Sequence, residues 1–359
     1  MTALGGTLGV GHISGLAISL SVAGPGLIPW MWVITLIGMA TRFSETYLAV
    51  RFRQRDDRGQ VIGGPMEAIC AGLGPNWRYL AVLFAVFCTV GMFGLGNNVQ
   101  AQQLTEALHD LSGLPPAALG MATAALTGWV LSGGLGRISR VASLLVPLMT
   151  LTYLLTVAVL LGLHANQLPL AIEAMLQAAF DPRALGGGAL ALVVRKAVST
   201  SVLTNDTGQG TTSFAHGAAA PADPRRQGAI AMLCNLVSTG VCTATALVLM
   251  VSGILDNPLR LQSSLDRDPG GLRLLLDACA TSLAGSEPIV TVVVALFAFT
   301  SLVTYGFYGE RCFTFLVGPQ GRRPFQLVWI GVVALAAIHA VPDPWGLADT
   351  TDALMVLPN

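Results

Sequence analysis

Apolar stretches long enough to cross a lipid bilayer follow one another along almost the whole sequence. A helix needs about twenty apolar residues to cross a hydrocarbon core about 30 Å thick. Nine stretches approach or exceed that length: residues 3–23, 26–50, 79–105, 116–136, 141–163, 186–217, 227–254, 287–309 and 325–341. The chain is 53% hydrophobic and only 11% charged, whereas soluble domains carry about 25% charged residues. We therefore expect an all-α membrane protein with several membrane spans.

Basic residues are distributed unevenly over the connections between these spans. If successive connections alternate sides, twelve arginines fall on one side and four on the other. The richer side holds Arg51, Arg53, Arg55, Arg58, Arg78, Arg137, Arg140, Arg225, Arg226, Arg311, Arg322 and Arg323, and the poorer side holds Arg183, Arg260, Arg267 and Arg273. Cytoplasmic loops of membrane proteins are enriched in arginine and lysine. We therefore expect a multi-pass protein of the cell (inner) membrane with its Arg-rich loops in the cytoplasm.

Two of the nine spans carry glycines and polar residues at mid-depth. The first contains "GGTLGVGHISGLAISLSVAGPG" and the sixth contains "STSVLTNDTGQGTTSFAHGAAA". Unpaired backbone in hydrocarbon costs several kcal/mol per group, so an interrupted helix persists only where it lines a cavity or binds something. Two such spans, five apart, predict an inverted five-plus-five repeat with breaks near Gly9 to His12 and Asn205 to Gly210. The alternative is that the glycines only permit close helix packing, which does not explain "TNDTGQG".

Five stretches of the sequence resemble one known family of carriers. They read "GPGLIPWMWVITLIGMATRFSETYLAVRFR", "GGPMEAICAGLG", "GLGNNVQA", "TNDTGQGTTSFAHGAA" and "FAFTSLVTYGFYGERC". In this order they resemble the bacterial and archaeal alanine or glycine:cation symporters, also called sodium:alanine carriers. The resemblance implies a leucine-transporter-like fold and uptake of small neutral amino acids across the lipid bilayer. It implies sodium as the co-transported cation, with a proton in some members, and no further cofactor.

The resemblance also sets an expected domain layout. We expect a single transmembrane transport domain over 1–359, with a first repeat at about 1–164 and a second at about 165–359. The family usually has a further span before the first broken helix and one or more spans after "LPN". We therefore expect a domain that is truncated at both ends and lacks the last helix. Two hypotheses follow, a working symporter and a non-transporting remnant of one.

The resemblance places a sodium site between the first and eighth spans. Thr300 and Ser301 are adjacent hydroxyls, similar to the pair that leucine-transporter-like proteins use for the cation site shared across the fold. Backbone carbonyls of Gly5, Leu8 and Phe297 would complete the shell. Hard oxygens of this kind suit sodium and add no net charge. The alternative is that each hydroxyl bonds its own helix one turn earlier.

The same resemblance indicates an amino-acid site at the two breaks. The expected binding residues are Val10, Gly11, His12, Asn97, Gln100, Thr204, Asn205, Asp206, Gly208, Leu302 and Tyr305. The family usually has Thr-Gly-Asn where this chain has Val10, Gly11 and His12, and Glu where Asp206 stands. It commonly has Ile and Trp where Leu302 and Tyr305 stand, and Asn in place of Gln102. The spacing of Asn97 and Gln100 predicts that both lie on one helix face, turned toward the bundle.

The sequence leaves a second interpretation of His12 open and bears on other classes of function, such as enzyme and channel. His12 has a second interpretation, a buried neutral imidazole bonded to a backbone carbonyl. A membrane enzyme is disfavoured because the sequence holds no HExxH, GxSxG or clustered acid-base set. A channel is harder to exclude, although two broken helices favour an occluding carrier. No nucleic-acid partner is expected, and the 255–286 connection is expected to hold an amphipathic surface helix.

Overall fold

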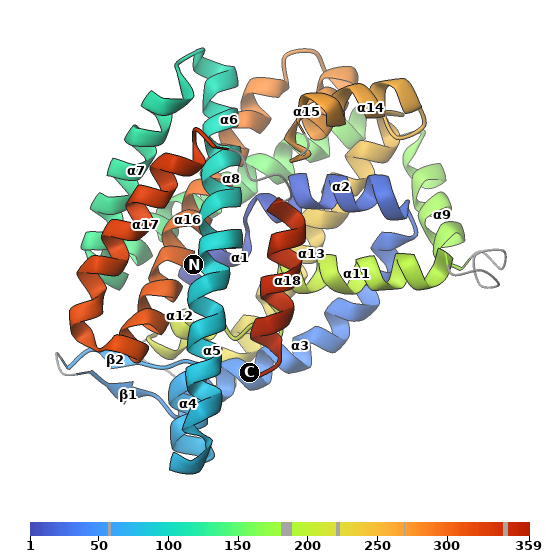
Figure 1. The fold of residues 1–359 in the computed structure, drawn as a ribbon. Coiled ribbons are helices and arrows are strands. Elements are labelled where there is room, and N and C mark those ends of the chain that lie inside the picture. The colour runs from blue at the N-terminus through green and yellow to red at the C-terminus, as the bar shows by residue number, and fades with distance from the viewer. Residues whose placement is uncertain (57–58, 181–188, 220–222, 269, 340–343) are drawn as a thin grey trace.

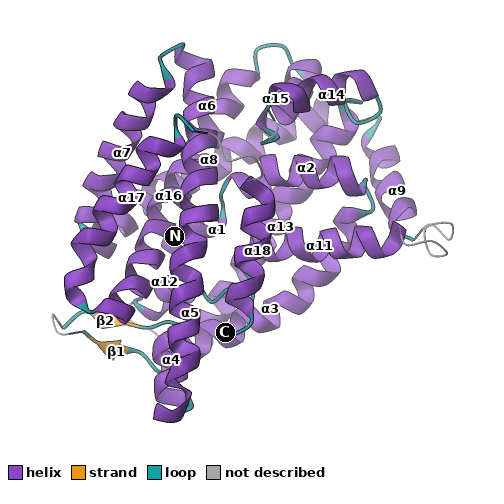
Figure 2. Cartoon of the chain, viewed as in Figure 1, coloured by secondary structure: helices purple, strands orange, loops and turns teal. Residues whose placement is uncertain are grey.

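The computed structural model describes residues 1–359 apart from 57–58, 181–188, 220–222, 269 and 340–343. Its regular elements are helices, joined by loops, and one small antiparallel hairpin (Figures 1 and 2) of β1 Gln54–Arg55 and β2 Val61–Ile62. Its helices are α1 Thr2–Thr7, the 3-10 turn η1 Val10–His12, α2 Ser14–Ala23, α3 Leu27–Arg51, α4 Pro65–Gly72, η2 Pro75–Trp77, α5 Arg78–Gly91, the π-helical η3 Met92–Val99, α6 Gln100–Ser112, α7 Pro116–Ser132, α8 Gly134–Leu163, α9 Leu168–Ala179, α11 Ala189–Asn205, α12 Ser213–Gly217, α13 Pro224–Val251, α14 Pro258–Arg267, α15 Leu272–Ser282, α16 Glu287–Val317, η4 Pro319–Gly321, α17 Arg322–Ala336 and α18 Pro344–Val356.

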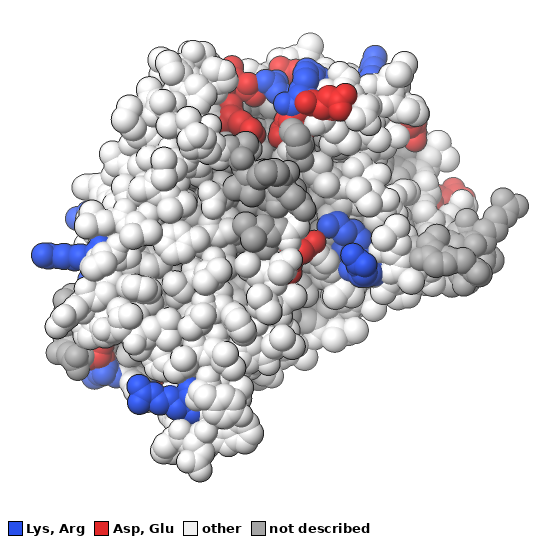
Figure 3. Space-filling model, viewed as in Figure 1, with Lys and Arg blue, Asp and Glu red and all other residues white. Residues whose placement is uncertain are grey.

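Several of these helices match the dimensions of a bilayer. Five are long and apolar enough to cross a membrane: Leu27–Arg51, Pro75–Ser112, Gly134–Leu163, Pro224–Val251 and Glu287–Val317. Their outer faces expose large apolar side chains such as Leu36, Ile37 and Leu144, which are 64%, 69% and 70% exposed. A soluble protein would bury such a surface. Figure 3 shows one face on which most side chains are uncharged, with charged groups at the upper edge, at the left and lower left edges, at the right edge and in one group near the middle. The chain is a multi-pass membrane protein.

Each of the nine predicted spans coincides with a helix or with a broken pair of helices. The first, 3–23, is the pair α1 and α2, and the sixth, 186–217, contains the pair α11 and α12. Both pairs are interrupted where glycine and polar residues cluster, so the predicted breaks are confirmed. The uninterrupted spans are longer than predicted in places; α16, for example, continues to Val317.

Helix α16 forms the centre of the bundle. Its most apolar window is 78% buried, and it packs against α1, α5, α6, α8 and α17. A helix that is apolar on all sides is buried in this way. Where α1 crosses α16, a Cβ atom on Gly6 would lie 2.9 Å from Thr304 Cγ2. The glycine therefore allows the first broken helix to touch the central helix.

The structure contains helices that the sequence analysis did not anticipate. Helix α9 lies between the fifth and sixth spans, and α18 follows the ninth and packs against α5, η3 and α11. The connection 255–286 holds two helices, α14 and α15, where one amphipathic helix was expected. Parts of the predicted turns "FDPRALGGG" and "APADPRRQ", residues 181–188 and 220–222, lie outside the described residues.

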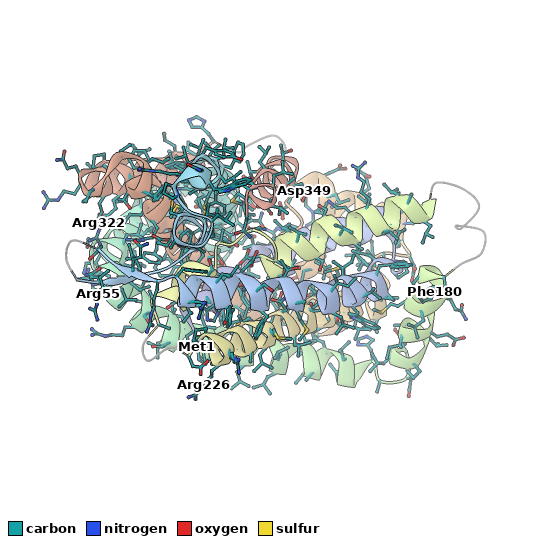
Figure 4. All side chains as sticks on the ribbon, turned by 90° about the horizontal axis from the view of Figure 1, so that it is seen from below. Met1, Arg55, Phe180, Arg226, Arg322 and Asp349 are labelled. Carbon is teal, nitrogen blue, oxygen red and sulfur yellow. The ribbon has the colours of Figure 1, made fainter. Side chains whose placement is uncertain are left out.

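Arginines from three different connections lie toward the same end of the molecule (Figure 4). Figure 4 shows Met1, Arg55, Arg226 and Arg322 toward one end of the molecule and Phe180 at the opposite end. The first end carries the hairpin and α4, which precede the third span (Figure 1). This separation agrees with the alternation of loops assumed in the sequence analysis, because Phe180 belongs to the connection on the poorer side.

Candidate functional site

The backbone of the first broken helix loses its regular hydrogen bonds between Thr7 and Ser14. The amide of Gly9 donates to the carbonyl of Thr7, and that of His12 donates to the carbonyl of Gly9. The amide of Val10 donates to the side-chain Oε1 of Gln100 at 3.4 Å. In a continuous α-helix these three amides would donate to Gly5, Leu8 and Gly6 respectively. The break therefore leaves those three carbonyls without their helical donors, which makes them available to another partner.

The hydroxyl of Ser301 on α16 lies against these same carbonyls. Its Oγ is 3.1 Å from the oxygen of Gly5, 3.2 Å from that of Gly6 and 3.2 Å from that of Leu8. A serine hydroxyl has one hydrogen and can donate to only one of the three oxygens at a time. A Cβ on Gly9 would approach this Oγ to 2.8 Å. Four oxygens thus converge where one proton cannot satisfy them all, and such a set suits a small hard cation.

The other predicted sodium ligands lie beside this cluster. The Oγ1 of Thr300 donates within α16, 3.1 Å from the carbonyls of both Leu296 and Phe297. This is the own-helix arrangement that the sequence analysis left open. Thr300 nevertheless packs next to the cluster, because a Cβ on Gly5 would lie 3.8 Å from Thr300 Cβ. Gly5, Leu8 and Ser301 are therefore brought together directly, and Gly6 joins them although the sequence analysis did not include it.

The second break follows Asn205, where α11 ends. Asp206 has a φ of 48° and is the one non-glycine residue with positive φ among the described residues, while Gly208 and Gly210 have φ of 83° and 70°. Aspartate tolerates this left-handed region better than most side chains. The Asp206 carboxylate is fully buried and accepts a 2.9 Å hydrogen bond from the hydroxyl of Tyr305. Two predicted site residues on different helices thus meet.

A buried arginine joins the two breaks, and sequence reasoning missed it. Arg42 lies within α3 and is fully buried. Its Nη1 donates to the carbonyls of Asn205 at 2.9 Å and Asp206 at 3.1 Å, and its Nη2 donates to Thr7 Oγ1 at 2.9 Å. A charged residue inside an apolar span is expensive and marks a functional position by default. The arginine inside the apolar span is visible in "GMATRF". The sequence prediction used only the arginines between spans.

His12 has partners on both ring nitrogens. Its Nδ1 is 3.2 Å from the carbonyl oxygen of Gly9, and its Nε2 is 2.7 Å from Ser238 Oγ on α13. Ser238 also lies 3.0 Å from the carbonyl of Thr204, to which it can donate. The imidazole therefore connects the first break to the end of α11 through α13. This agrees with the interpretation of His12 as a buried histidine with a backbone carbonyl partner, and it adds the serine link.

The two predicted residues of the third span have different partners. Gln100 points at the first break, whereas Asn97 Nδ2 donates to the carbonyl of Trp329 on α17 at 3.0 Å. The prediction assumed α-helical spacing, but Asn97 belongs to the π-helical segment η3. A π-helix makes i to i+5 hydrogen bonds and so changes the angular spacing of its residues. Both side chains are buried in the bundle, as expected, but they contact different helices.

The remaining predicted substrate residues lie in different surroundings. Gly11 faces α11, because its Cβ would lie 3.8 Å from Leu203, and Leu302 is fully buried on α16. The side chains of Thr204 and Asn205 turn away from the first break. Thr204 Oγ1 donates to Thr200 within its own helix, and Asn205 Nδ2 donates to Thr35 and Ser201. The carbonyl of Gly208 accepts a 2.8 Å hydrogen bond from Asn359.

A large cavity opens at the end of the molecule that carries Met1. Its volume is about 1090 Å³. Its lining includes Met1, Thr2, Ala3, Arg55, Glu67, Gly133, Phe214, His216, Glu310, Arg311 and Arg322. Two ion pairs stand in its wall, Arg311 with Glu67 at 3.6 Å and Arg322 with Glu310 at 2.9 Å. The cavity thus reaches α1 and α12, the two short half-helices, from the Arg-rich end.

The oxygens gathered at Ser301 have the chemistry of an alkali-cation site. The oxygen cluster at Ser301 is made of carbonyls and one hydroxyl, which carry no net charge. Uncharged oxygen ligands suit weakly bound hard cations rather than zinc or iron.

Comparison with known proteins agrees with this geometry. The crystal structure of MhsT in complex with L-phenylalanine matches 99% of this chain and 85% of MhsT, with a TM-score of 0.72 at 16% identity. At this identity the likeness establishes the fold. The fold is the leucine-transporter-like inverted repeat, with its first and sixth helices broken at the positions described above.

Curated relatives match over the whole chain. A Haemophilus influenzae protein described as an uncharacterized transporter is 38% identical, over 100% of this chain and 78% of its own length. The sodium/alanine symporter AgcS of Methanococcus maripaludis is 32% identical, over 100% of this chain and 79% of AgcS. The expected truncation at both ends stays a prediction. The model of the sodium:alanine symporter family matches residues 1–359. The chain belongs to the sodium:alanine symporter family.

Proposed function

We propose that this protein is a carrier, not an enzyme, that imports a small neutral amino acid such as alanine or glycine together with sodium. The observation that carries this proposal is the cluster of Ser301 Oγ with the carbonyls of Gly5, Gly6 and Leu8. Sodium bound there would hold the first break against α16. Binding of the cation and formation of the amino-acid site would then depend on each other.

The polar groups at the two breaks suit the two ends of an amino acid. Helix α2 begins at Ser14, directly after the break, and the positive end of its dipole favours a carboxylate there. The bare backbone of Gly11 offers such a group a close approach. On the opposite side, the Asp206 carboxylate is the acid nearest the break of α11 and suits the substrate ammonium. Tyr305 and Leu302 are buried on α16; we infer that they bound the side-chain pocket of the substrate and that it accepts small side chains.

The cavity at the Arg-rich end supports transport by alternating access. It is lined by residues of α1 and α12, and we infer that a solute released from the breaks leaves toward that end. Cytoplasmic loops are rich in arginine, and we infer that this end faces the cytoplasm in the cell membrane. The opposite end would open in the alternate state of the carrier, which needs a rocking motion between bundles.

Uptake into proteoliposomes tests the proposal. Radiolabelled alanine and glycine are offered to vesicles with an inward sodium gradient, with an inward proton gradient, and with neither. We expect accumulation above equilibrium with the sodium gradient alone. Thr156→Ala provides a matched control, because Thr156 bonds only its own helix carbonyl at Thr152 and lies away from both breaks. Accumulation driven equally well without sodium would overturn the proposal.

A further inference from the structure

Arg42 has an unusual set of partners for a buried charge. All three of its acceptors are uncharged oxygens: the carbonyls of Asn205 and Asp206 and the hydroxyl of Thr7. No hydrogen bond joins Arg42 to the carboxylate of Asp206, which accepts from Tyr305. The carboxylates of Asp206 and Glu45 nevertheless lie within electrostatic range of the guanidinium. Buried arginines ordinarily pair with carboxylates. The guanidinium here occupies a position that is defined by backbone and hydroxyl oxygens.

The end of α11 explains why a positive charge is held there. The last carbonyls of a helix have no helical donors and carry the partial negative charge of the helix dipole. Asn205 is the last residue of α11, and Asp206 turns the chain away with its φ of 48°. In hydrocarbon these carbonyls need a partner other than water. Either a bound cation or a fixed cationic side chain can be that partner.

The oxygen set around Arg42 resembles the one around Ser301. Each set combines backbone carbonyls of a broken helix with one hydroxyl, and each includes α1, through Thr7 in one and through Gly5, Gly6 and Leu8 in the other. The two sets differ in what the chain itself supplies. At Arg42 the protein inserts a permanent positive charge, since arginine does not lose its proton in proteins. At Ser301 it supplies only a hydroxyl.

We propose that Arg42 is a built-in cation that does at the end of α11 what a second bound sodium would otherwise do. Transport then couples to sodium only at the Ser301 cluster, one ion per amino acid. The inference rests on the proposed function, because it concerns the stoichiometry of that symport. Arg42 is a positioning residue: it links the half-helices α1 and α11 through Thr7 and Asn205 without using a co-transported ion.

The packing around Arg42 keeps the guanidinium in place. A Cβ on Gly38, one turn earlier on α3, would lie 3.0 Å from Thr207 Cγ2, so this glycine brings α3 against the break of α11. Glu45, one turn later, is the acid of the same helix, and its Oε1 accepts a 2.6 Å hydrogen bond from Asn359. His216 of α12 lies within electrostatic range of Arg42 on the side of the cavity.

The competing role for Arg42 is direct binding of the substrate carboxylate. Its Nε is buried and has no hydrogen-bond partner within the described part of the chain. The two roles predict different results when the charge is removed. A substrate partner affects the half-saturating alanine concentration and leaves the sodium dependence unchanged. A built-in cation affects the number and affinity of the sodium ions.

The experiment compares wild type with Arg42→Lys, Arg42→Gln and Arg42→Ala in proteoliposomes, and Arg51→Ala serves as the control. Arg51 ends the same helix and is exposed. The sodium-to-alanine ratio is measured from the membrane potential at which net flux reverses. For wild type and Arg51→Ala we expect about one sodium per alanine and a sodium Hill slope of about one.

For Arg42→Ala we expect uptake to fall at least about tenfold, because the carbonyls lose their cation. Millimolar guanidinium should restore it, and at high sodium without guanidinium the Hill slope should rise toward about two. Arg42→Lys should retain most of the uptake.

A wild-type protein that couples to two sodium ions would overturn the inference. So would an Arg42→Gln variant with an altered alanine affinity and an unchanged sodium dependence. Wild type without sodium-driven uptake of either amino acid would instead refute the proposed function. If Arg42→Ala does not fold, the wild-type ratio and the lysine variant still decide.

Discussion

The hydroxyl of Tyr305 donates a 2.9 Å hydrogen bond to the carboxylate of Asp206. Tyr305 lies on the unbroken helix α16, and Asp206 is the first residue after α11 ends. Both side chains are buried, at 3% and 0% exposure. The bond therefore fixes the acid of the second break to the same helix that carries Ser301. One rigid element thus holds groups from both breaks.

Replacing Tyr305 by phenylalanine tests this link. The change removes the hydroxyl that donates to the buried carboxylate, which costs about 1–3 kcal/mol. We expect a lower unfolding temperature in detergent and a higher half-saturating alanine concentration. Tyr308→Phe is the matched control, because Tyr308 is fully buried on the same helix and its hydroxyl has no partner among the described residues. Equal effects of the two variants would count against a specific role for the Tyr305 to Asp206 bond.

The two adjacent hydroxyls of α16 should differ in importance. Ser301→Ala removes the oxygen that meets three carbonyls of α1, whereas Thr300→Ala removes one that bonds its own helix. We expect Ser301→Ala to raise the half-saturating sodium concentration about tenfold or more, since losing a buried polar contact costs about 1–3 kcal/mol. Thr300→Ala should have a clearly smaller effect. Sodium titrations of alanine uptake measure both, and a larger effect at Thr300 would place the cation nearer to that residue.

Replacing His12 by asparagine, the usual residue of the family, tests the serine link. Asparagine is shorter and cannot span from Gly9 to Ser238, a connection that His12 makes at 3.2 Å and 2.7 Å. We expect a change in alanine affinity or cation choice that exceeds the change in membrane abundance. Uptake is measured across about pH 5.5 to 8, the range in which an ordinary histidine titrates. His109→Asn, at an exposed position on α6, is the control. Identical transport and pH profiles would identify His12 as a packing residue.

Glu67 in the wall of the cavity should make stability depend on pH. It lies on α4, outside the spanning helices, where burial raises its pKa above the usual value and the nearby Arg311 lowers it in part. An acid with a raised pKa keeps its proton longer in the folded state than in the unfolded one. Stability therefore falls as pH rises from the ordinary glutamate range through the raised pKa.

The variant Glu67→Gln isolates this contribution. It should lose the stability change over that pH window, because glutamine does not titrate. Unfolding temperatures of purified protein measured in buffers on both sides of the window provide the comparison. If the variant follows the same pH profile as wild type, another group is responsible for the dependence.

Much of the fold was predictable because membrane spans are set by local composition. Apolar length located the spans, and clusters such as "TNDTGQG" located the breaks, since an interrupted helix in hydrocarbon needs a polar environment. Helix α18 was not predicted, because its short sequence contains aspartates and threonines and lacks a long apolar run. The π-helical turn at Asn97 was also missed, since nothing in its sequence distinguishes it from an α-helix.

The candidate site was predicted in part, for a physical reason. Backbone carbonyls become ligands only where a helix breaks, so Gly5 and Leu8 were accessible to reasoning from the break together with the family resemblance. The direction of a side chain depends on packing between distant elements. Asn205 turns toward Thr35 of α3, and no local pattern indicates that. Arg42 was detectable as a charge inside an apolar span, but its partners on α1 and α11 required the three-dimensional arrangement.

In the proposed mechanism, sodium and the amino acid bind to one site formed by the two breaks and α16. The most direct test is equilibrium binding of radiolabelled alanine to the purified protein, with sodium varied and choline as the replacement, in wild type and Ser301→Ala. Binding that depends on both ligands must show reciprocal coupling. We expect that alanine binding to wild type requires sodium, that alanine in turn tightens sodium binding, and that Ser301→Ala weakens this coupling. Alanine binding of equal affinity with and without sodium would contradict this mechanism.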